Sequence, residues 1–193
     1  MWDQILPELR IKLFLTLLLG VIYPLAMTGI SQVLFPHQAN GSLLKSGDKV
    51  ISSELIGQNF AKPYYFQGRP SAAGNDGYDG TASAGSNFGA TNKKLVDRVQ
   101  AAVEKFRKEN PGYNGPIPAD LLTTSASGLD PHISPDSAAA QVARVAAARN
   151  ADQEKIRAVV AQFTEGPDLG LLGEPRVNVL RLNLALDQQF PLR

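Results

Sequence analysis

An uncharged stretch near the N-terminus constrains this chain more than any other feature of its sequence. Residues 13–35 read LFLTLLLGVIYPLAMTGISQVLF and contain no Asp, Glu, Lys or Arg. A helix of this length, at about 1.5 Å per residue, is about 34 Å long and can cross a hydrocarbon core of about 30 Å. The sequence therefore predicts one transmembrane helix over 13–35, preceded by a short N-terminal segment, 1–12.

A proline and several small residues lie inside the predicted helix. Pro24 is at mid-span and is expected to kink the helix or to loosen one backbone hydrogen bond. Gly20, Thr28 and Gly29 are small, and small side chains let a second helix approach closely. These four residues are candidates for contact with a partner helix; the alternative is that the small residues only tolerate lipid.

A cleaved signal peptide is the competing interpretation of this stretch. The apolar core of a signal peptide is usually about 7–15 residues long and is followed by a small-x-small cleavage site. Here the apolar stretch is longer, no such site follows Phe35, and Asp3 and Glu8 precede it. We therefore favour an uncleaved anchor in the lipid bilayer.

Basic residues around the predicted helix indicate its orientation. Arg10 and Lys12 adjoin its N-terminal end, whereas the first basic residue beyond it is Lys45. Cytoplasmic flanks of membrane helices carry an excess of Lys and Arg. We therefore expect residues 1–12 in the cytoplasm, a single pass through the cytoplasmic (inner) membrane, and the soluble part outside.

The remaining residues predict a stalk followed by one soluble domain. Residues 36–49 are polar and contain glycine, as linkers do, and 50–193 suffice for one domain with its own core. The expected fold class is α+β, with helices packed on a small sheet. We expect one helix over 92–109, a second that begins at Ser134 and ends at Asn150, and a third that Asn150 caps and Gly166 ends. Short β-prone runs lie within 50–60 and 63–70, and 180–186 predicts a strand.

A long segment, 68–92, is rich in Gly, Ser, Ala and Asn. Loops of this length without helix or strand are uncommon in compact domains and are often functional. Its only large apolar residues are Tyr78 and Phe88. The segment is therefore predicted to be a surface loop pinned by these two side chains, and it is our candidate for contact with a partner.

Composition excludes several classes of function. The 19 basic and 18 acidic side chains give a net charge of +1, whereas a nucleic-acid partner requires a clustered basic excess. With no cysteine and only two histidines, thiolate chemistry, disulfides and His-rich metal sites are excluded. The phosphate-binding patterns GxxxxGK[ST] and GxGxxG are also absent. We therefore expect no nucleic-acid partner, no metal and no cofactor bound by this chain itself.

The stretch SASGLDPHIS places Asp130, His132 and Ser134 two residues apart. One interpretation is a catalytic or metal-binding cluster in a membrane-anchored envelope enzyme. The other is a turn that begins a helix, with Ser134 as the capping residue and Asp130 accepting hydrogen bonds from loop N–H groups. A capping serine uses its oxygen to hold a backbone N–H, which is not the work of a nucleophile, and a metal would lack further ligands. We therefore favour the turn.

Three arginines lie in segments of low charge density: Arg69, Arg144 and Arg176. We favour the interpretation that each pairs with a carboxylate or with loop carbonyl groups. The alternative is that they face a partner protein.

Six segments occur in a characteristic order behind the single span: LIGQNF, YFQGRPSA, SAGSNFGATN, SASGLDPHIS, QVARVAAARN and GEPRVNVLRLNLALD. Together they resemble the KdpC family, one of the components of the Kdp-type potassium-transporting ATPase, over nearly the whole chain. Besides those of the span, the motif positions offered as candidate partner contacts are Arg69, Pro70, Ser71, Ser86, Asn87, Gly128, Leu129, Asp130, Arg144, Arg176 and Asn178.

The resemblance implies a subunit without catalysis of its own. Its partners would be a channel-like subunit that selects potassium, a P-type ATPase subunit and a small membrane peptide; the complex, rather than this chain, would use ATP and potassium. The soluble part would cap the outer side of the channel-like subunit and support assembly. The P-type signature DKTGT is absent here. An alternative that the resemblance raises is a nucleotide-binding helper of the ATPase subunit, with Gln141 as the candidate residue.

Overall fold

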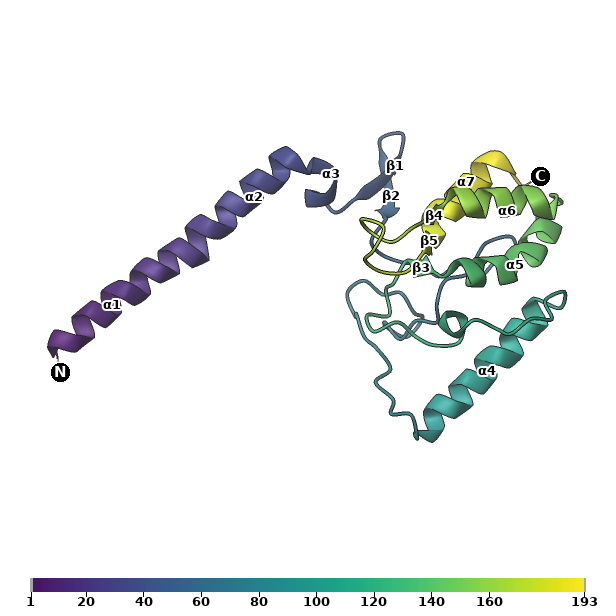
Figure 1. Cartoon of the computed structure of the whole chain (residues 1–193), viewed down its shortest axis with the longest axis horizontal. Helices are drawn as coiled ribbons and strands as arrows, with labels where there is room; N and C mark the ends of the chain where they lie inside the picture. The colour runs from purple at the N-terminus through teal and green to yellow at the C-terminus, as the bar shows by residue number, and fades with distance from the viewer. Residues whose placement is uncertain (1, 193) are drawn as a thin grey trace. The chain divides into compact units, whose positions relative to one another are not determined.

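The computed structural model describes residues 2–192 and divides the chain into two compact units, residues 1–53 and 54–193. The first unit begins with α1 (Trp2–Leu17), a π-helical segment (Leu18–Ile22) and α2 (Tyr23–Leu34), which form one uninterrupted helical rod (Figure 1). Within the described residues, Gln4–Leu34 is the one stretch of helix long and apolar enough to cross a membrane. The predicted span, 13–35, is therefore helical almost throughout, and the helix begins earlier than the sequence suggested.

The π-helical segment lies directly before Pro24, where the sequence predicted a disturbance. Pro24 has no N–H, and in a regular α-helix its ring meets the carbonyl group four residues earlier. Here the N–H of Tyr23 donates to the carbonyl of Leu18, five residues back, so the wider turn accommodates the proline. The hydroxyl of Thr28 donates to the carbonyl of Pro24 at 2.8 Å. Thus the helix continues past the proline with altered hydrogen bonding.

Residues after α2 form a short helix, α3 (Pro36–Ala39), and a hairpin of β1 (Leu43–Ser46) and β2 (Lys49–Ser53). Gly47, at the hairpin turn, has a φ of 59°, which glycine adopts without strain. The β-prone run over 50–60 thus contributes a strand only up to Ser53, and 63–70 contains none, so that prediction was wrong for most of both runs.

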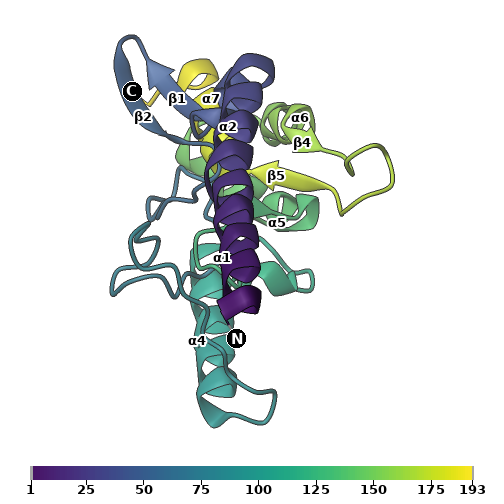
Figure 2. The same cartoon turned by 90° about the vertical axis from the view of Figure 1, so that its left-hand side faces the viewer.

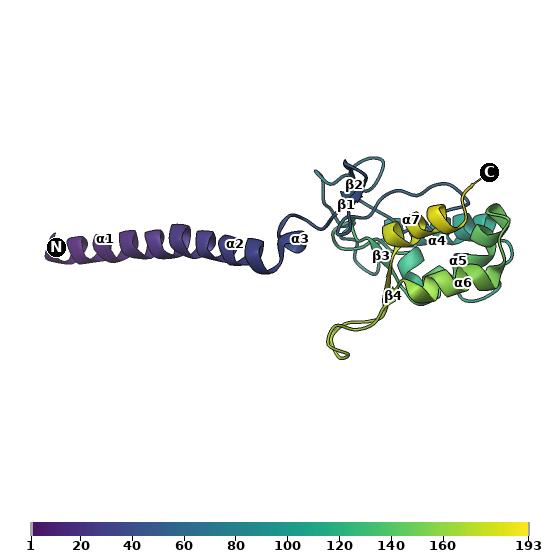
Figure 3. The ribbon, with the colours of Figure 1, turned by 90° about the horizontal axis from the view of Figure 1, so that it is seen from above.

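The second unit is built around α5 (Pro135–Ala148), α6 (Gln153–Gln162) and α7 (Val179–Gln189). A small antiparallel sheet of order β3-β5-β4 joins them: β3 is His132–Ile133, β4 is Thr164–Glu165 and the central β5 is Arg176–Asn178. Figure 3 shows α5 and α6 side by side with α7 close to both. The main core lies among these elements; its wholly buried members include Val142, Val145, Ile156, Val177, Leu182 and Leu186. The α+β prediction is confirmed.

The remaining helix, α4 (Lys93–Glu109), lies at one edge of the unit, reached through long loops (Figures 1 and 2). It matches the helix predicted over 92–109, and Asn92 caps it by accepting a hydrogen bond from the N–H of Lys94 at 2.9 Å. Only Phe106 of α4 is fully buried, in a small second cluster with Leu121 and Ala140. Leu121 belongs to a 3₁₀ turn (Ala119–Leu121).

Two predicted elements were wrong in type or boundary. The alternating run over 180–186 is helix α7 rather than a strand, because leucine favours helices and Asn178 caps the helix by accepting from the N–H of Arg181 at 3.1 Å. Asp152, rather than Asn150, caps α6. Asn150 has a φ of 51° and ends α5, as predicted, whereas α6 stops at Gln162, before Gly166.

Candidate functional site

Asp130, His132 and Ser134 shape the start of α5. Ser134 accepts the N–H of Ser137 at 3.1 Å, and Asp120 in turn accepts the N–H of Ser134 at 2.8 Å. The Ser134 hydroxyl lies 3.2 Å from Asp120 Oδ1, so its oxygen is engaged in the helix cap. The predicted turn, with Ser134 as the capping residue, is confirmed.

Asp130 fastens this turn to a second segment. Its Oδ1 accepts the N–H of His132 at 3.0 Å, and its Oδ2 lies 3.3 Å from Nη1 of Arg69. Burial raises the pKa of the Asp130 carboxyl, but the hydrogen bonds and charge of His132 and the charge of Arg69 outweigh burial and leave the pKa below its ordinary value. Asp130 is therefore a charged tie between two loops.

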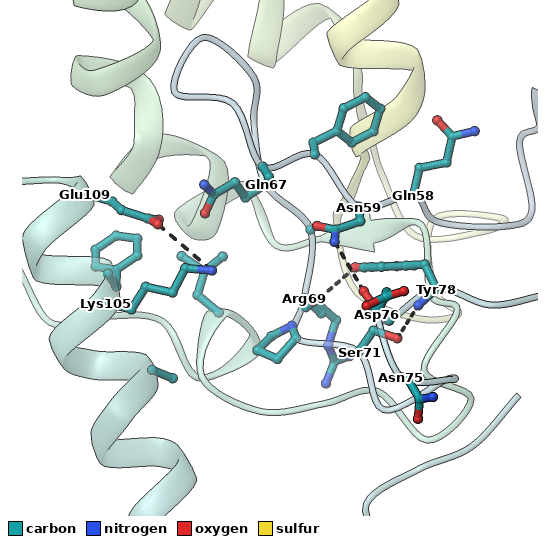
Figure 4. Close-up of a pocket in the computed structure, with 18 residues that line it drawn as sticks. Gln58, Asn59, Gln67, Arg69, Ser71, Asn75, Asp76, Tyr78, Lys105 and Glu109 are labelled. Atoms are coloured by element: carbon teal, nitrogen blue, oxygen red, sulfur yellow. Dashed lines mark hydrogen bonds and ion pairs between the residues drawn. The ribbon is translucent and has the colours of Figure 1, made fainter. Parts of the chain in front are cut away.

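An open hollow of about 350 Å³ lies between these loops and α4 (Figure 4). Its wall combines polar and apolar side chains; ten of the lining residues are labelled in Figure 4, namely Gln58, Asn59, Gln67, Arg69, Ser71, Asn75, Asp76, Tyr78, Lys105 and Glu109. Among them, the charged pair drawn along α4 is Lys105 with Glu109, at 3.9 Å, with Lys105 exposed and Glu109 partly buried. The predicted loop 68–92 thus supplies much of the wall, and Arg69, Pro70 and Ser71 come together there.

Within the described residues, no three His, Cys, Asp or Glu side chains gather closely enough to hold a metal ion. The wall instead presents amide and carboxylate groups at an open surface. Because small-ligand sites usually bury most of the ligand, an open hollow suits contact with another protein better than binding of a small ligand.

Tyr78 orders the loop that forms the wall. Its hydroxyl donates to the carbonyl of Arg69 at 2.6 Å, and its N–H donates to Ser71 Oγ at 2.8 Å (Figure 4). A Cβ at Gly57 would collide with the ring of Tyr78, and a Cβ at Gly68 would collide with its hydroxyl group. Burial, with the nearby charge of Asp130, raises the pKa of Tyr78 to about 12 against the opposing effect of Arg69. Tyr78 is therefore one of the two pins that the sequence predicted; the other, Phe88, lies with its ring centroid 5.4 Å from the guanidinium of Arg98.

Two buried carboxamides hold residues 66 and 67, the second of which lines the hollow, and we name them the carboxamide clamp: Gln141 of α5 and Asn183 of α7. Asn183 accepts the N–H of Phe66 at 2.9 Å and donates to its carbonyl at 2.9 Å. Gln141 likewise accepts the N–H of Gln67 at 2.8 Å and donates to its carbonyl at 3.1 Å. Each side chain thus bonds the main chain as a neighbouring β-strand would.

The remaining hydrogen-bonding capacity of Gln141 is also used. Its Oε1 accepts from Nη2 of Arg144 at 2.7 Å, and its Nε2 donates to the carbonyl of Ser137 at 3.2 Å. An amide has two acceptor lone pairs and two donor hydrogens, so these four bonds saturate it. A nucleotide at Gln141 would have to displace bonds that hold the fold.

The three arginines predicted from the sequence are partly buried and make internal contacts. Arg144 donates to the carbonyl groups of Pro63 and Tyr65 and to Asn110 Oδ1, and burial lowers its pKa to about 10 against the opposing charge of Glu109. Arg69 pairs with Asp130, as above, and Arg176 lies 3.4 Å from Glu165 and 3.2 Å from Asp168. All three predicted arginines therefore make the internal contacts that we favoured.

Arg149 was not singled out from the sequence, although its side chain is fully buried. Its Nη2 lies 2.7 Å from Asp187 Oδ1, and it donates to the carbonyl groups of Tyr64 at 2.8 Å and Phe190 at 2.9 Å. Nothing in the sequence singled out Asn183 either, except that it is polar within a leucine-rich run.

The other motif residues lie away from the hollow or behind its wall. Ser86 Oγ accepts a hydrogen bond from Nη2 of Arg98 at 3.1 Å. The neighbouring Asn87 has a φ of 49°. Gly128 has a φ of 68° and its carbonyl accepts Ser71 Oγ at 2.6 Å, while Leu129 accepts the N–H of Gly57 at 2.8 Å. The side-chain amide of Asn178 donates to the carbonyl of Glu54 at 2.8 Å. Gly20, Pro24, Thr28 and Gly29 belong to the other unit. Their roles as partner contacts stay predictions.

Known proteins resemble this chain along almost its whole length. A family model described as "K+-transporting ATPase, c chain" matches residues 5–188. The potassium-transporting ATPase KdpC subunit of Myxococcus xanthus is 54% identical over 191 residues, covering 98% of this chain and 90% of that protein. The subunit of the same name from Rhodospirillum rubrum is 55% identical over 186 residues, covering 96% of each. The chain therefore belongs to the KdpC family of potassium-transporting ATPase components.

Proposed function

We propose that this chain is a non-catalytic accessory subunit of an ATP-driven, high-affinity potassium uptake complex. The observation that carries the proposal, beside family membership, is how its polar residues are used. Asp130, Ser134 and Gln141, the candidates for chemistry, are all engaged in holding loops and helix caps. A domain whose buried polar groups shape an outer surface suits recognition of partners rather than catalysis.

The proposed role is to cap the outer side of the channel-like subunit and to support assembly with the P-type ATPase subunit and the small membrane peptide. The candidate contact is the hollow together with the loop 68–92, which presents side chains at an open surface. Arg10 and Lys12, in the helix directly before the uncharged stretch 13–35, favour an N-terminus in the cytoplasm and the second unit outside the inner membrane.

Topology is tested first, because the chain contains no cysteine. Ser83→Cys, in the loop, and Glu8→Cys, near the N-terminus, are treated in intact cells with a membrane-impermeant thiol reagent. We expect the first variant to react in intact cells and the second only after permeabilisation. The reverse pattern would place the soluble unit in the cytoplasm and overturn the capping role.

Assembly and catalysis are tested with purified proteins. Co-expressed with the other subunits, the chain is expected to co-purify with a potassium-stimulated ATPase, whereas the chain alone hydrolyses no ATP. ATP hydrolysis by the chain alone, abolished by His132→Ala, would favour the envelope-enzyme alternative. Saturable binding of ATP to the full chain, measured by calorimetry and lost in a Gln141 variant that keeps its fold, would favour the nucleotide-helper alternative.

A further inference from the structure

The turn between β4 and β5 exposes three leucines, and we name residues 167–175, PDLGLLGEP, the leucine turn. Leu169, Leu171 and Leu172 are 91%, 87% and 62% exposed, more than any other large apolar residue described in the second unit. Figures 2 and 3 both show this turn projecting away from the helices of that unit. Adjacent exposed apolar side chains of this kind mark interaction sites.

The leucine turn has a defined conformation. The N–H of Asp168 donates to the carbonyl of Leu172 at 2.8 Å, and the N–H of Leu172 returns a bond to the carbonyl of Asp168 at 2.9 Å. At its base, Arg176 bridges Asp168 and Glu165. The leucines are therefore held on a braced hairpin, so docking them costs less ordering entropy than docking a loose loop.

The backbone of Leu169 is itself unusual. Its φ is 55°, in the left-handed region that glycine and asparagine occupy more readily than leucine. A large apolar side chain therefore occupies a position where the backbone disfavours it and water surrounds it. Such outliers persist where they serve a function, which points to a use for the exposed side chain.

Charge around the turn indicates what covers it. The segment 165–176 contains three carboxylates, of Glu165, Asp168 and Glu174, and one guanidinium, of Arg176. Arg181 of α7 also pairs with Glu165 at 3.0 Å, so the net charge around the turn is −1. The surface of an anionic bilayer attracts basic segments, and an acidic one is repelled. A protein pocket with an apolar floor and a basic rim matches both the leucines and the charge.

We propose that the leucine turn inserts into an apolar, basic-rimmed pocket on another protein subunit of the transport complex. This inference rests on the proposed function and adds to it a second contact, separate from the hollow. Small clusters of buried apolar side chains commonly supply most of the binding energy of an interface, while polar surroundings give complementarity.

A fluorescent probe distinguishes the pocket from the membrane. Leu171→Cys, the single cysteine of the chain, is labelled with an environment-sensitive fluorophore in the full chain. The chain is placed in nanodiscs of phosphatidylethanolamine and phosphatidylglycerol, alone and with the other subunits. We expect a blue shift only in the complex and no quenching by spin-labelled lipids. A blue shift and lipid quenching in the chain alone, or no shift in the complex, would overturn the proposal.

A double variant tests the contribution to assembly. Leu169→Asn with Leu171→Asn removes the apolar tip, and asparagine suits the left-handed backbone at 169, so the melting temperature should not fall. We expect at least a tenfold loss of co-purifying subunits. The matched control is Val96→Asn on α4, where the exposed fraction is 56%, and it should assemble normally.

The outcomes separate this inference from the proposed function. If the unaltered chain assembles and the double variant assembles equally well, only the role of the leucine turn is overturned. If the unaltered chain itself fails to co-purify with the other subunits, the proposed function is overturned, and the docking proposal with it.

Discussion

The two halves of the second unit, the helices α5, α6 and α7 and the loop-rich residues 54–131, are each stabilised by a different kind of interaction. Around α5, α6 and α7, apolar side chains such as Val142, Ile156 and Leu186 are buried in one continuous core. Residues 54–131 instead contain long loops and one helix, with few fully buried apolar residues such as Phe66 and Phe106. Polar side chains of the helical half form hydrogen bonds with the main chain of residues 54–131.

Adjacent residues of α7 illustrate this difference. Leu182 is wholly buried in the apolar core, and Asn183, 1% exposed, reaches the loop segment through the carboxamide clamp. Apolar packing is non-directional and sums over many contacts, whereas a clamp concentrates its effect in a few hydrogen bonds. The loop half should therefore be sensitive to single polar substitutions that leave the helical half intact.

The largest effect is expected for Leu182→Ala. Truncating a wholly buried leucine typically costs about 2–5 kcal/mol of unfolding free energy, because transfer and cavity terms add. Denaturant unfolding of the full chain in detergent measures the loss, and hydrogen exchange should show reduced protection in both halves. Faster hydrogen exchange confined to residues 54–131 would contradict the idea that the helical core supports the loops.

Asn183→Ala should come next and should act locally. It leaves the N–H and carbonyl of the fully buried Phe66 without partners, at a cost of about 3 kcal/mol. Hydrogen exchange is expected to increase around residues 63–71 while α5 and α6 stay protected. Asn75→Ala, on the exposed rim, is the matched control and should change the unfolding free energy by less than about 0.5 kcal/mol. Equal loss of protection in all helices would erase the contrast between the halves.

Gly128→Ala tests the packing of loop against loop. Gly128 has a φ of 68°, and an added Cβ would lie 2.5 Å from the carbonyl oxygen of Ala84 and 2.8 Å from the N of Ala73. We expect a loss of about 2 kcal/mol in unfolding free energy, from backbone strain and displacement of the loop. Gly89→Ala, whose Cβ would meet no atom within 4 Å, is the control. An unchanged unfolding free energy in Gly128→Ala would mean that these loops can separate freely.

Tyr78→Phe should have the smallest effect, about 1 kcal/mol, from loss of the bond to the Arg69 carbonyl. The pKa of Tyr78 is raised to about 12 in the folded chain, from an ordinary value of 10.0. Folding therefore favours the protonated phenol; this stability is complete below pH 10 and is lost as the pH rises through about 12. Unfolding measured across this range should show a steeper alkaline decline in the unaltered chain than in Tyr78→Phe.

Elements with strong local signals could be predicted from the sequence. The helices beginning after Asn92 and Ser134 follow capping residues and have regular apolar spacing, and both lie where expected. Helix α7 was missed because leucines at 180, 182, 184 and 186 alternate as in a strand. A strand would place Asn183 on the outer face, whereas the helix buries it.

The candidate site was much less predictable. The clamp joins residues 74 and 117 positions apart, and such pairings leave no local pattern in a single sequence. The loop 68–92 and its pin Tyr78 could be predicted, because composition and an isolated aromatic residue are local features. The wall of the hollow required knowledge of how α4 and three loops meet.

The carboxamide clamp holds a segment through its main chain, so the attachment does not depend on which side chains the segment carries. Gln141 forms hydrogen bonds with the main-chain N–H and carbonyl of Gln67, groups that nearly every residue provides. These bonds do not depend on the side chain of Gln67, which lines the hollow. Evolution can therefore change what position 67 displays without loosening its attachment, provided that Gln141 stays. Across relatives, we expect Gln141 to be constant, while the side chain at position 67 varies with the partner that it contacts.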